Sequence, residues 1–285
     1  MPLILRKCKE NGYSRNGFFY GNTGDIVTAP DWNPRPECGN GLHGLLEGNG
    51  CWELLDGTDW LIIEANDKDI IEIDEDKCKF STGKILFRGT KEELKNSIFV
   101  NKLKLNSSGA YLWALNIGNH DVMINKITDS QYAYYWALNV GNKDIMIDKI
   151  TSSEYAYYWA LDFGNHDIMI NKIIDSKYAY NWALNIGNQD VMINKITDSQ
   201  YAYYWALNVG NKDIMIDKIT SSEFAYFWAL NIGNQDVMIN KINDSEYAYL
   251  WALDIGNHDI MKPKITDFHY IQLWNQAFYN DKITT

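Results

Sequence analysis

The side chains most capable of chemistry gather between Ala29 and Leu45, where three prolines and three glycines fix the backbone around Cys38 and His43. Thiolate and imidazole are the ligands that zinc prefers, and Cys51 or Cys78 could complete a set with these two residues. The spacing matches no strong zinc signature, because the chain has no Cys-x-x-Cys pair. Buried free thiols and a hydrogen-bonded histidine explain these residues more simply, so no metal is predicted.

Within this segment, residues 38–43 read Cys-Gly-Asn-Gly-Leu-His. They resemble the Cys-Gly-x-Gly-(Leu/Phe)-His motif of an uncharacterised N-terminal domain that precedes repeat regions in phage and bacterial proteins. The resemblance covers the part of the chain before its own repeats and implies no established activity. It does imply a setting, in which a phage or mobile element blocks a host defence machine, as anti-CRISPR and other counter-defence inhibitors do.

Residues 39–42 are also similar, more loosely, to the Gly-x-Gly-(Ile/Leu) segment that lines the nicotinamide pocket of ADP-ribosyltransferases. This similarity implies an NAD-dependent enzyme, targeted by its repeats, as an alternative function. The chain departs from that family in the first strand, which lacks a His followed by Gly-Ser and offers only Arg6. The late catalytic glutamate has no evident match, although Glu64 and Glu93 can be proposed. We therefore expect a protein that is not an enzyme and needs no cofactor.

Most of the chain is one short unit copied in tandem. Residues 113–135 differ from residues 182–204 only where His120 becomes Gln189. A repeat of this length is typical of a solenoid, in which each unit buries its apolar face against its neighbours, and such arrays bind other molecules and rarely catalyse reactions. The tryptophans that recur every 23 residues are Trp113, Trp136, Trp159, Trp182, Trp205, Trp228, Trp251 and Trp274.

Capping and periodicity predict a first helix in each unit, as residues 128–151 illustrate. Thr128 to Gln131 has the spacing of a capping box, with Thr128 as the N-cap. Gly141 would supply the left-handed residue that ends this helix after about three turns. The apolar residues on one helical face, at i, i+3, i+4 and i+7, are Ala133, Trp136, Ala137 and Val140.

A second, shorter helix should follow in each unit. Asn142 and Asp144 offer a new N-cap and a first-turn carboxylate, and the segment closes at Ile150. A strand in a leucine-rich repeat is the alternative, but the L-x-x-L-x-L-x-x-N spacing of that family is absent.

The predicted fold is therefore an α-solenoid of helix-turn-helix repeats over residues 94–285, with about seven repeats and atypical ends. Residues 98–105 would form a lone second helix before the first repeat. At the other end, Pro263 would interrupt a second helix, and the unit from Trp274 to Thr285 loses the Gly-Asn turn.

Residues 1–93 differ in composition and predict a small α+β domain that is mostly β. Asn66-Asp67 predicts a hairpin between the third and fourth strand-like runs. Thr90 to Glu93 is a further capping box and predicts the helix that leads into the array. The strand-like runs lie at residues 3–5, 18–20, 60–65, 70–73 and 84–87.

The charge balance limits the partners. The chain carries 37 Asp and Glu against 26 Lys and Arg, and all four arginines precede residue 90. Because the repeats lack a guanidinium for phosphate, we expect no direct nucleic-acid binding. No apolar run reaches the roughly 18 residues of a membrane span, and no signal peptide is evident. We therefore expect a cytoplasmic protein with reduced thiols and no membrane partner.

The candidate binding site is the edge formed by the residue after each Gly-Asn pair and by the aspartate that follows it. The first position always carries a polar donor yet varies among near-identical units, which favours a row of adjustable contacts for another protein, one of the host. A solvated helix start is the structural explanation of the same residues, and a scaffold or virion-associated role is a further alternative. The predicted binding residues are His120, Asp121, Lys143, Asp144, His166, Asp167, Gln189, Asp190, Lys212, Asp213, Gln235 and His258.

Overall fold

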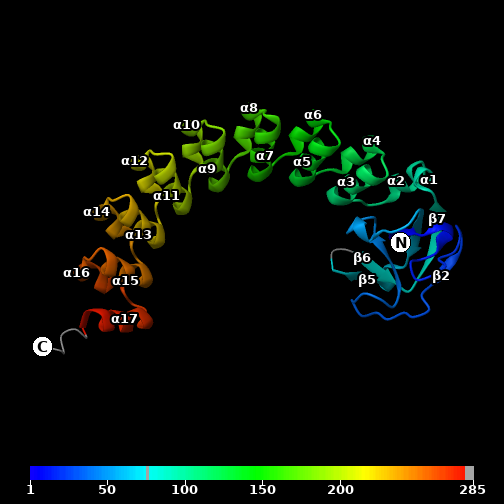
Figure 1. Cartoon of the computed structure of the whole chain (residues 1–285), viewed down its shortest axis with the longest axis horizontal. Coiled ribbons are helices and arrows are strands. Elements are labelled where there is room, and N and C mark those ends of the chain that lie inside the picture. The colour runs from blue at the N-terminus through cyan, green and yellow to red at the C-terminus, as the bar shows by residue number, and fades with distance from the viewer. Residues whose placement is uncertain (75–76, 280–285) are drawn as a thin grey trace. The chain divides into compact units, whose positions relative to one another are not determined.

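The computed structural model describes residues 1–74 and 77–279 (Figure 1). Internal contacts divide the chain into two compact units, Met1–Thr151 and Ser152–Thr285. The first unit contains a seven-stranded sheet followed by helices, whereas the described part of the second unit contains helices only. Tandem helical repeats with a period of 23 residues occupy both units.

The sheet pairs its strands in the order β2-β7-β4-β1-β3-β6-β5, and every pairing in the described residues is antiparallel. Ile4 and Leu5 of the central strand β1 are both fully buried. Because neighbouring residues of a strand point to opposite faces, both faces of the sheet are covered at its centre. The strands are β1 (Leu3–Cys8), β2 (Ile26–Thr28), β3 (Leu42–Leu46), β4 (Asp59–Ala65), β5 (Ile70–Ile73), β6 (Lys77–Phe80) and β7 (Thr82–Gly89).

Four of the five predicted strand runs are confirmed, as β1, β4, β5 and β7. The strand predicted at residues 18–20 is wrong: an isolated bridge between Tyr13 and Phe19 forms there, and Tyr20 instead packs into the apolar cluster on one face of the sheet. The short strands β2, β3 and β6 are not among the predicted runs.

The hairpin predicted at Asn66-Asp67 is also wrong. Strand β4 pairs with β1 and β7, whereas β5 pairs with β6. The side chain of Asn66 accepts a hydrogen bond from the backbone N–H of Lys68 and caps the 3-10 turn Asp67–Asp69. A turn does form at the predicted place, but it leads the chain away from β4 and not into a hairpin with it.

The helix predicted after residue 90 is confirmed as α1 (Lys91–Lys95). Its capping box is complete, because the Thr90 hydroxyl accepts from the backbone N–H of Glu93 and the Glu93 carboxylate accepts from that of Thr90. Within residues 98–105, a single helical turn forms as α2 (Phe99–Lys102).

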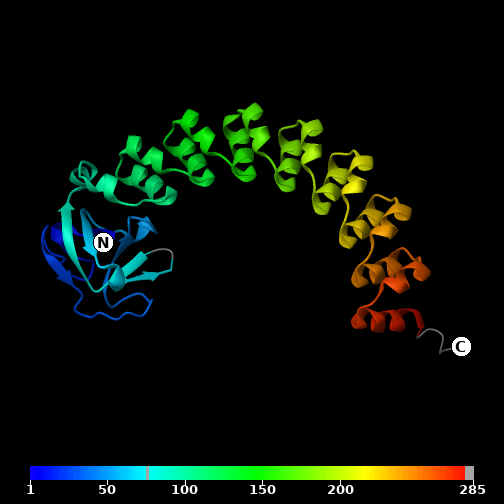
Figure 2. The same ribbon diagram turned by 180° about the vertical axis from the view of Figure 1, so that it is seen from behind.

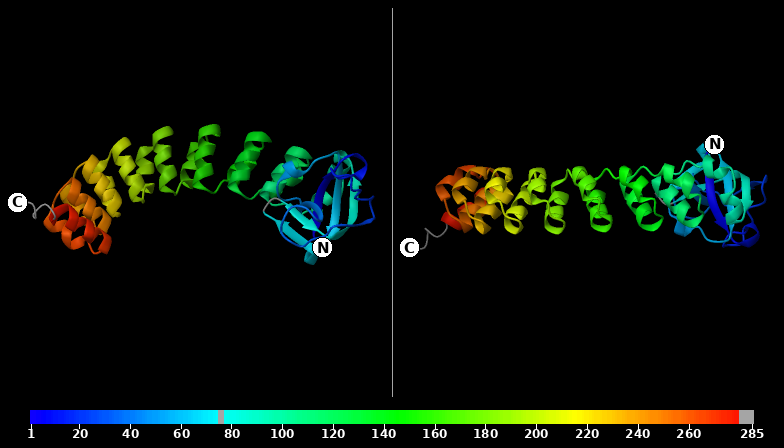
Figure 3. Two further views of the ribbon diagram at one scale, coloured as in Figure 1. Left: turned by 60° about the horizontal axis from the view of Figure 1, so that its bottom comes forward. Right: turned by 90° about the horizontal axis from the view of Figure 1, so that it is seen from above.

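Each repeat that is described in full contains one long helix, one short helix and a 3-10 turn. This confirms the two helical segments predicted for each repeat. Within the second unit, the long helices from α7 to α17 lie along one side and the short helices from α8 to α16 along the other (Figures 1 and 2). Figure 3 shows the same stacking in chain order within that unit. The long helices are α3 (Ser107–Asn116), α5 (Ser130–Asn139), α7 (Ser153–Phe163), α9 (Ser176–Asn185), α11 (Ser199–Asn208), α13 (Ser222–Asn231), α15 (Ser245–Asp254) and α17 (Phe268–Tyr279). The short helices are α4 (His120–Met123), α6 (Lys143–Met146), α8 (His166–Met169), α10 (Gln189–Met192), α12 (Lys212–Met215), α14 (Gln235–Met238) and α16 (His258–Met261).

Where a threonine is the predicted N-cap, as before α5, α7, α11 and α13, the N-cap lies one residue later. In α5 the Asp129 side chain accepts from the backbone N–H groups of Gln131, at 2.8 Å, and of Tyr132, at 3.2 Å. Thr128 has another role, since its own backbone N–H donates to the Ser107 hydroxyl of the preceding repeat. The prediction failed because a threonine and the residue after it are both suitable caps, and a contact between repeats decides between them.

The glycine that ends each long helix does adopt positive φ, at 113° for Gly187. The next residue, Asn188, is the left-handed one, with φ 52° and ψ 41°, and it is the N-cap of α10. Both residues of the Gly-Asn pair are therefore needed to turn the chain from one helix into the next.

The repeats pack around the tryptophans, as predicted. Every tryptophan from Trp113 to Trp251 is fully buried, together with the alanine three residues before it. The methionine of each short helix, such as Met192, is also fully buried. The 23-residue period thus reflects one core of Trp, Ala and Met rebuilt in each unit.

Polar side chains join neighbouring repeats. The buried Ser176 hydroxyl accepts from the backbone N–H groups of Thr197, at 2.9 Å, and Asp198, at 3.2 Å. The Lys218 ammonium donates to the carbonyl oxygens of Ile193 and Ile196, where the preceding 3-10 turn ends. These hydrogen bonds satisfy backbone groups that the short helices leave unpaired.

Replacing Ser176 by Ala should destabilise the protein by about 1–3 kcal/mol, because two backbone N–H groups between repeats lose their acceptor. Urea denaturation followed by circular dichroism measures the change. Thr197→Ala is the matched control, since the exposed Thr197 side chain reaches only the Ser176 hydroxyl. Equal losses in the two variants would show that Ser176 contributes through packing and not as an acceptor.

Pro263 does not interrupt its helical segment, contrary to prediction. It lies in the first turn of the 3-10 segment Lys262–Lys264, where a missing backbone N–H costs little. The last repeat retains its long helix α17 up to Tyr279, and the predicted loss of a Gly-Asn turn from residue 280 onward lies outside the described residues.

Candidate functional site

The predicted binding residues occupy the first two positions of the short helices. All twelve side chains are exposed, and they recur once per repeat on the short helices of each unit. The edge inferred from the sequence is therefore accessible in both units.

The three histidines and Gln189 at the first position also have a structural task. His166 Nε2 lies 3.1 Å from the carbonyl oxygen of Ala160, and Gln189 Nε2 lies 3.5 Å from that of Ala183. These side chains approach carbonyls near the end of the preceding long helix, and the Ala160 carbonyl also accepts from the backbone N–H of Gly164. This contact accounts for the polar donor in the repeats that carry His120, His166, Gln189 and His258.

Two rows of exposed apolar side chains were missed by the sequence reasoning. A leucine two residues after each tryptophan from Trp113 to Trp251 is 45–47% exposed, and an Ile or Val two residues after each donor position from Lys143 to His258 is 38–50% exposed. The signal was present, because these residues fall outside the i, i+3, i+4 stripe that Trp and Ala already fill. The leucines are Leu115, Leu138, Leu161, Leu184, Leu207, Leu230 and Leu253, and the branched residues are Ile145, Ile168, Val191, Ile214, Val237 and Ile260.

A hollow between neighbouring repeats brings the leucine row and the polar edge together. In the first unit, a cavity of about 360 Å³ is lined by Leu115 and His120 of one repeat, by Asn139 and Val140 of the next, and by Lys91 of α1. Such a hollow can accept an apolar side chain and offer it polar contacts at the rim. Because the repeats are nearly identical, the same residue types recur at each step of the array.

The repeats carry more carboxylates than lysines. Between residues 152 and 279 the sequence has 15 Asp and Glu against 8 Lys. Four of these lysines donate to backbone carbonyls of a preceding repeat, and these are Lys195, Lys218, Lys241 and Lys264. The exposed Asp row, with Asp167 and Asp190 among its members, consequently gives the edge an acidic character.

The motif at residues 38–43 leads into strand β3, and its His43 lies beside Arg6 of β1. Arg6 Nη1 donates to the backbone carbonyl of His43. Burial, and then the positive charges of Arg6, Lys77 and Lys79, lower the pKa of His43 to about 4. His43 is therefore neutral at physiological pH.

The glutamates considered for transferase chemistry lie elsewhere. Neither Glu64 nor Glu93 lines the cavity that Arg6, His43 and residues 39–41 border, and Glu93 is engaged in the cap of α1. The cysteines considered for zinc are also separate: Cys78 is buried, with burial raising its pKa to about 12, and Cys38 is exposed. Among the described residues, no group of three His, Cys, Asp or Glu side chains is placed to hold a metal ion.

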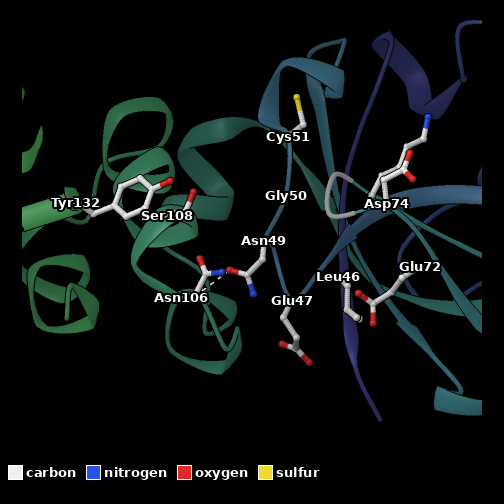
Figure 4. Close-up of a pocket in the computed structure, with 11 residues that line it drawn as sticks. Leu46, Glu47, Asn49, Gly50, Cys51, Glu72, Asp74, Asn106, Ser108 and Tyr132 are labelled. Atoms are coloured by element: carbon white, nitrogen blue, oxygen red, sulfur yellow. Dashed lines mark hydrogen bonds between the residues drawn. The ribbon is translucent and has the colours of Figure 1, made fainter. Parts of the chain in front are cut away.

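The largest cavity shown, of about 690 Å³, lies in the first unit between the sheet and the first repeats (Figure 4). Two of its polar side chains, Asn49 and Glu47, hold backbone groups on either side of it. The Asn49 side chain accepts from the backbone N–H of Asn106, and the Glu47 carboxylate accepts from those of Leu3 and Lys104. This cavity is thus the junction that holds the first repeat against the sheet.

Among the described residues, no helix combines the length and apolar character that a membrane crossing requires. Comparison with known proteins finds no family model, no curated protein and no solved structure that matches this chain. The geometry of its own side chains is therefore what supports a function.

Proposed function

We propose that the chain is a non-enzymatic protein-binding repeat protein, whose repeats stack as an α-solenoid behind a small α+β domain. The partner is another protein, which binds along the edge formed by the short helices. The single observation that carries this proposal is the hollow between repeats, where the exposed Leu115 meets His120 of the predicted edge.

The composition of this edge supports a protein partner. It combines apolar side chains that are about half exposed with a polar donor and an aspartate in each repeat. Contacts repeated along a stiff array add up even when each is weak. The acidic row favours a partner surface that carries Lys and Arg beside apolar residues.

The phage counter-defence setting rests on the resemblance of residues 38–43 and stays a prediction.

A scaffold role is the proposal that competes with partner binding. Gel filtration with light scattering separates a scaffold from a binding protein, because a scaffold forms open-ended polymers. Affinity capture from a host lysate with mass spectrometry should identify the partner, and the purified partner then serves in the measurements below.

Replacing Leu161, Leu184 and Leu207 together by Ser should weaken binding of the purified partner at least about tenfold, since apolar contacts of three consecutive repeats are lost. The change in stability should be small, because each leucine is already nearly half exposed. Isothermal titration and thermal unfolding measure the two effects. Unchanged affinity would remove the leucine row from the binding surface.

A further inference from the structure

The long helices of the second unit carry a row of aromatic side chains that the proposed function does not use. Six rings on α9, α11 and α13 form a connected row, in which the centroids of neighbouring rings lie between 5.7 and 6.5 Å apart. All except Tyr203 are partly exposed to solvent. The residues of this ring row are Tyr180, Tyr201, Tyr203, Tyr204, Phe224 and Phe227.

Two hydroxyls of the ring row can donate a hydrogen bond outward. Tyr201 Oη makes no hydrogen bond among the described residues and is not one of their atoms buried without a partner, so it reaches solvent. Tyr180 Oη accepts from the amide of the exposed Asn208 at 2.8 Å, which leaves its own hydrogen to donate. The second N–H of that amide donates to the Tyr204 carbonyl at 3.0 Å and so fixes the amide in place. The row therefore combines apolar ring faces with hydrogen-bond donors.

Carboxylates lie close to these hydroxyls. Burial, and then the negative charges of Asp175 and Asp198, raise the pKa of Tyr201. Both aspartates are exposed N-caps, of α9 and α11, and no ion pair among the described residues includes either of them. The ammonium of Lys177 lies over the Tyr178 ring, 5.1 Å from its centroid. The surroundings of the row consequently favour a ligand that carries Arg or Lys.

The spacing of stacked helices favours one ligand conformation over the others. Packed helices lie about 8–10 Å apart. A polyproline II helix repeats after three residues, or about 9.3 Å, so the same side of it meets each long helix in turn. An extended strand presents the same side about every 6.8 Å and falls out of register. An α-helix pairs its own backbone carbonyls and leaves the hydroxyl donors unused.

We propose that the ring row binds a proline-rich segment of another polypeptide in the polyproline II conformation. The proline rings pack against the aromatic rings, and carbonyl oxygens of the segment accept from the Tyr180 and Tyr201 hydroxyls. An Arg or Lys beside the prolines pairs with Asp175 or Asp198. Because proline has no backbone N–H, such a segment offers mainly carbonyl acceptors, which the donors of an aromatic groove match. The chain thereby has a second binding surface on its long helices, separate from the short-helix edge.

Isothermal titration of the full chain with a decaproline peptide that bears an arginine at each end tests the proposal. The control ligand has the same length and charge but carries Gly and Ser in place of Pro. We expect saturable binding of the proline peptide below about 1 mM. The control peptide should bind at least about tenfold more weakly, because it must be ordered on binding whereas polyproline II is already formed.

A first variant removes two rings of the row. Tyr204→Asn and Phe227→Leu together use residues that other repeats already carry at this helix position, as Asn181 and Leu250. The fold should therefore tolerate both changes, and circular dichroism should show unchanged helix content. The affinity for the proline peptide should fall at least about tenfold, since two of its contact surfaces are lost.

A second variant removes one donor and keeps its ring. Tyr201→Phe deletes a hydroxyl at a position where α13 carries Phe224. The affinity should fall about fivefold, the effect of one lost hydrogen bond. Tyr270→Phe is the matched control, because Tyr270 holds the same position in α17, outside the row, and the affinity should not change.

The absence of saturable binding of the proline peptide at about 1 mM would overturn the proposal, and so would equal affinities for the two peptides. Unchanged affinity in the folded variant that lacks the Tyr204 and Phe227 rings would also overturn it. Equal losses in Tyr201→Phe and Tyr270→Phe would overturn the role of the hydroxyl. None of these outcomes bears on the short-helix edge, which is tested with other residues and with the purified partner.

Discussion

Trp182→Ala is expected to lower the free energy of unfolding by about 3–5 kcal/mol, the range for a large aromatic residue leaving a packed core. The Trp182 side chain is fully buried, and its ring meets that of His166 edge-on at 5.8 Å between centroids. Its indole Nε1 has no hydrogen-bond partner among the described residues, so the decrease in the free energy of unfolding measures packing alone. Urea denaturation followed by circular dichroism gives the value.

Leu184→Ala, two residues later in the same helix, is the matched control. Its side chain is 46% exposed, so the substitution should cost a small fraction of the tryptophan value. A Trp182 loss no larger than that of Leu184 would contradict the core assignment of the tryptophan row.

The helical core could be predicted from the sequence because it follows from local periodicity. Trp136 and its neighbouring alanines lie on one helical face, and any arrangement of repeats must bury that face. The cap positions could not be fixed to the residue. Thr128 and Asp129 are both good N-caps, but the Thr128 hydroxyl lies 3.2 Å from the Ser107 hydroxyl of the preceding repeat, and Asp129 caps α5.

The sheet was harder to predict from the sequence, because strands that pair come from distant parts of the chain. The turn at Asn66 was found, yet nothing near it shows that β5 pairs with β6 or that β4 lies between β1 and β7. Short strands such as β3 gain their burial from distant neighbours, so their own few residues carry a weak signal.

The candidate edge was found because variation among near-identical repeats marks exposed positions. The leucines beside it were missed, because an apolar residue in a helix is usually assigned to the core. Here the buried face of the helix is already occupied by Trp and Ala. The hydrogen bond from His166 to the Ala160 carbonyl also depends on how the two helices of a repeat meet, which no spacing encodes.

Reversing the charge of Asp144, Asp167 and Asp190 together to Lys should weaken binding of the purified partner at least about tenfold, because like charges then face a basic surface. These side chains are exposed in the first turns of α6, α8 and α10, so each change removes only a modest interaction with the helix dipole. Surface plasmon resonance measures the affinity, and circular dichroism should show unchanged helix content. The effect should diminish as salt concentration rises.

The matched control reverses Glu154, Glu223 and Glu246, which are also first-turn carboxylates but belong to the long helices α7, α13 and α15. It applies the same change in net charge on the long helices, where Glu154 also hydrogen-bonds Tyr178 of the next repeat, and a partner seated on the short-helix edge should tolerate it. If both triple variants lose affinity equally, attraction is governed by net charge and not by the edge. If neither loses affinity, the binding surface lies outside the short helices, and the sheet domain becomes the region to test.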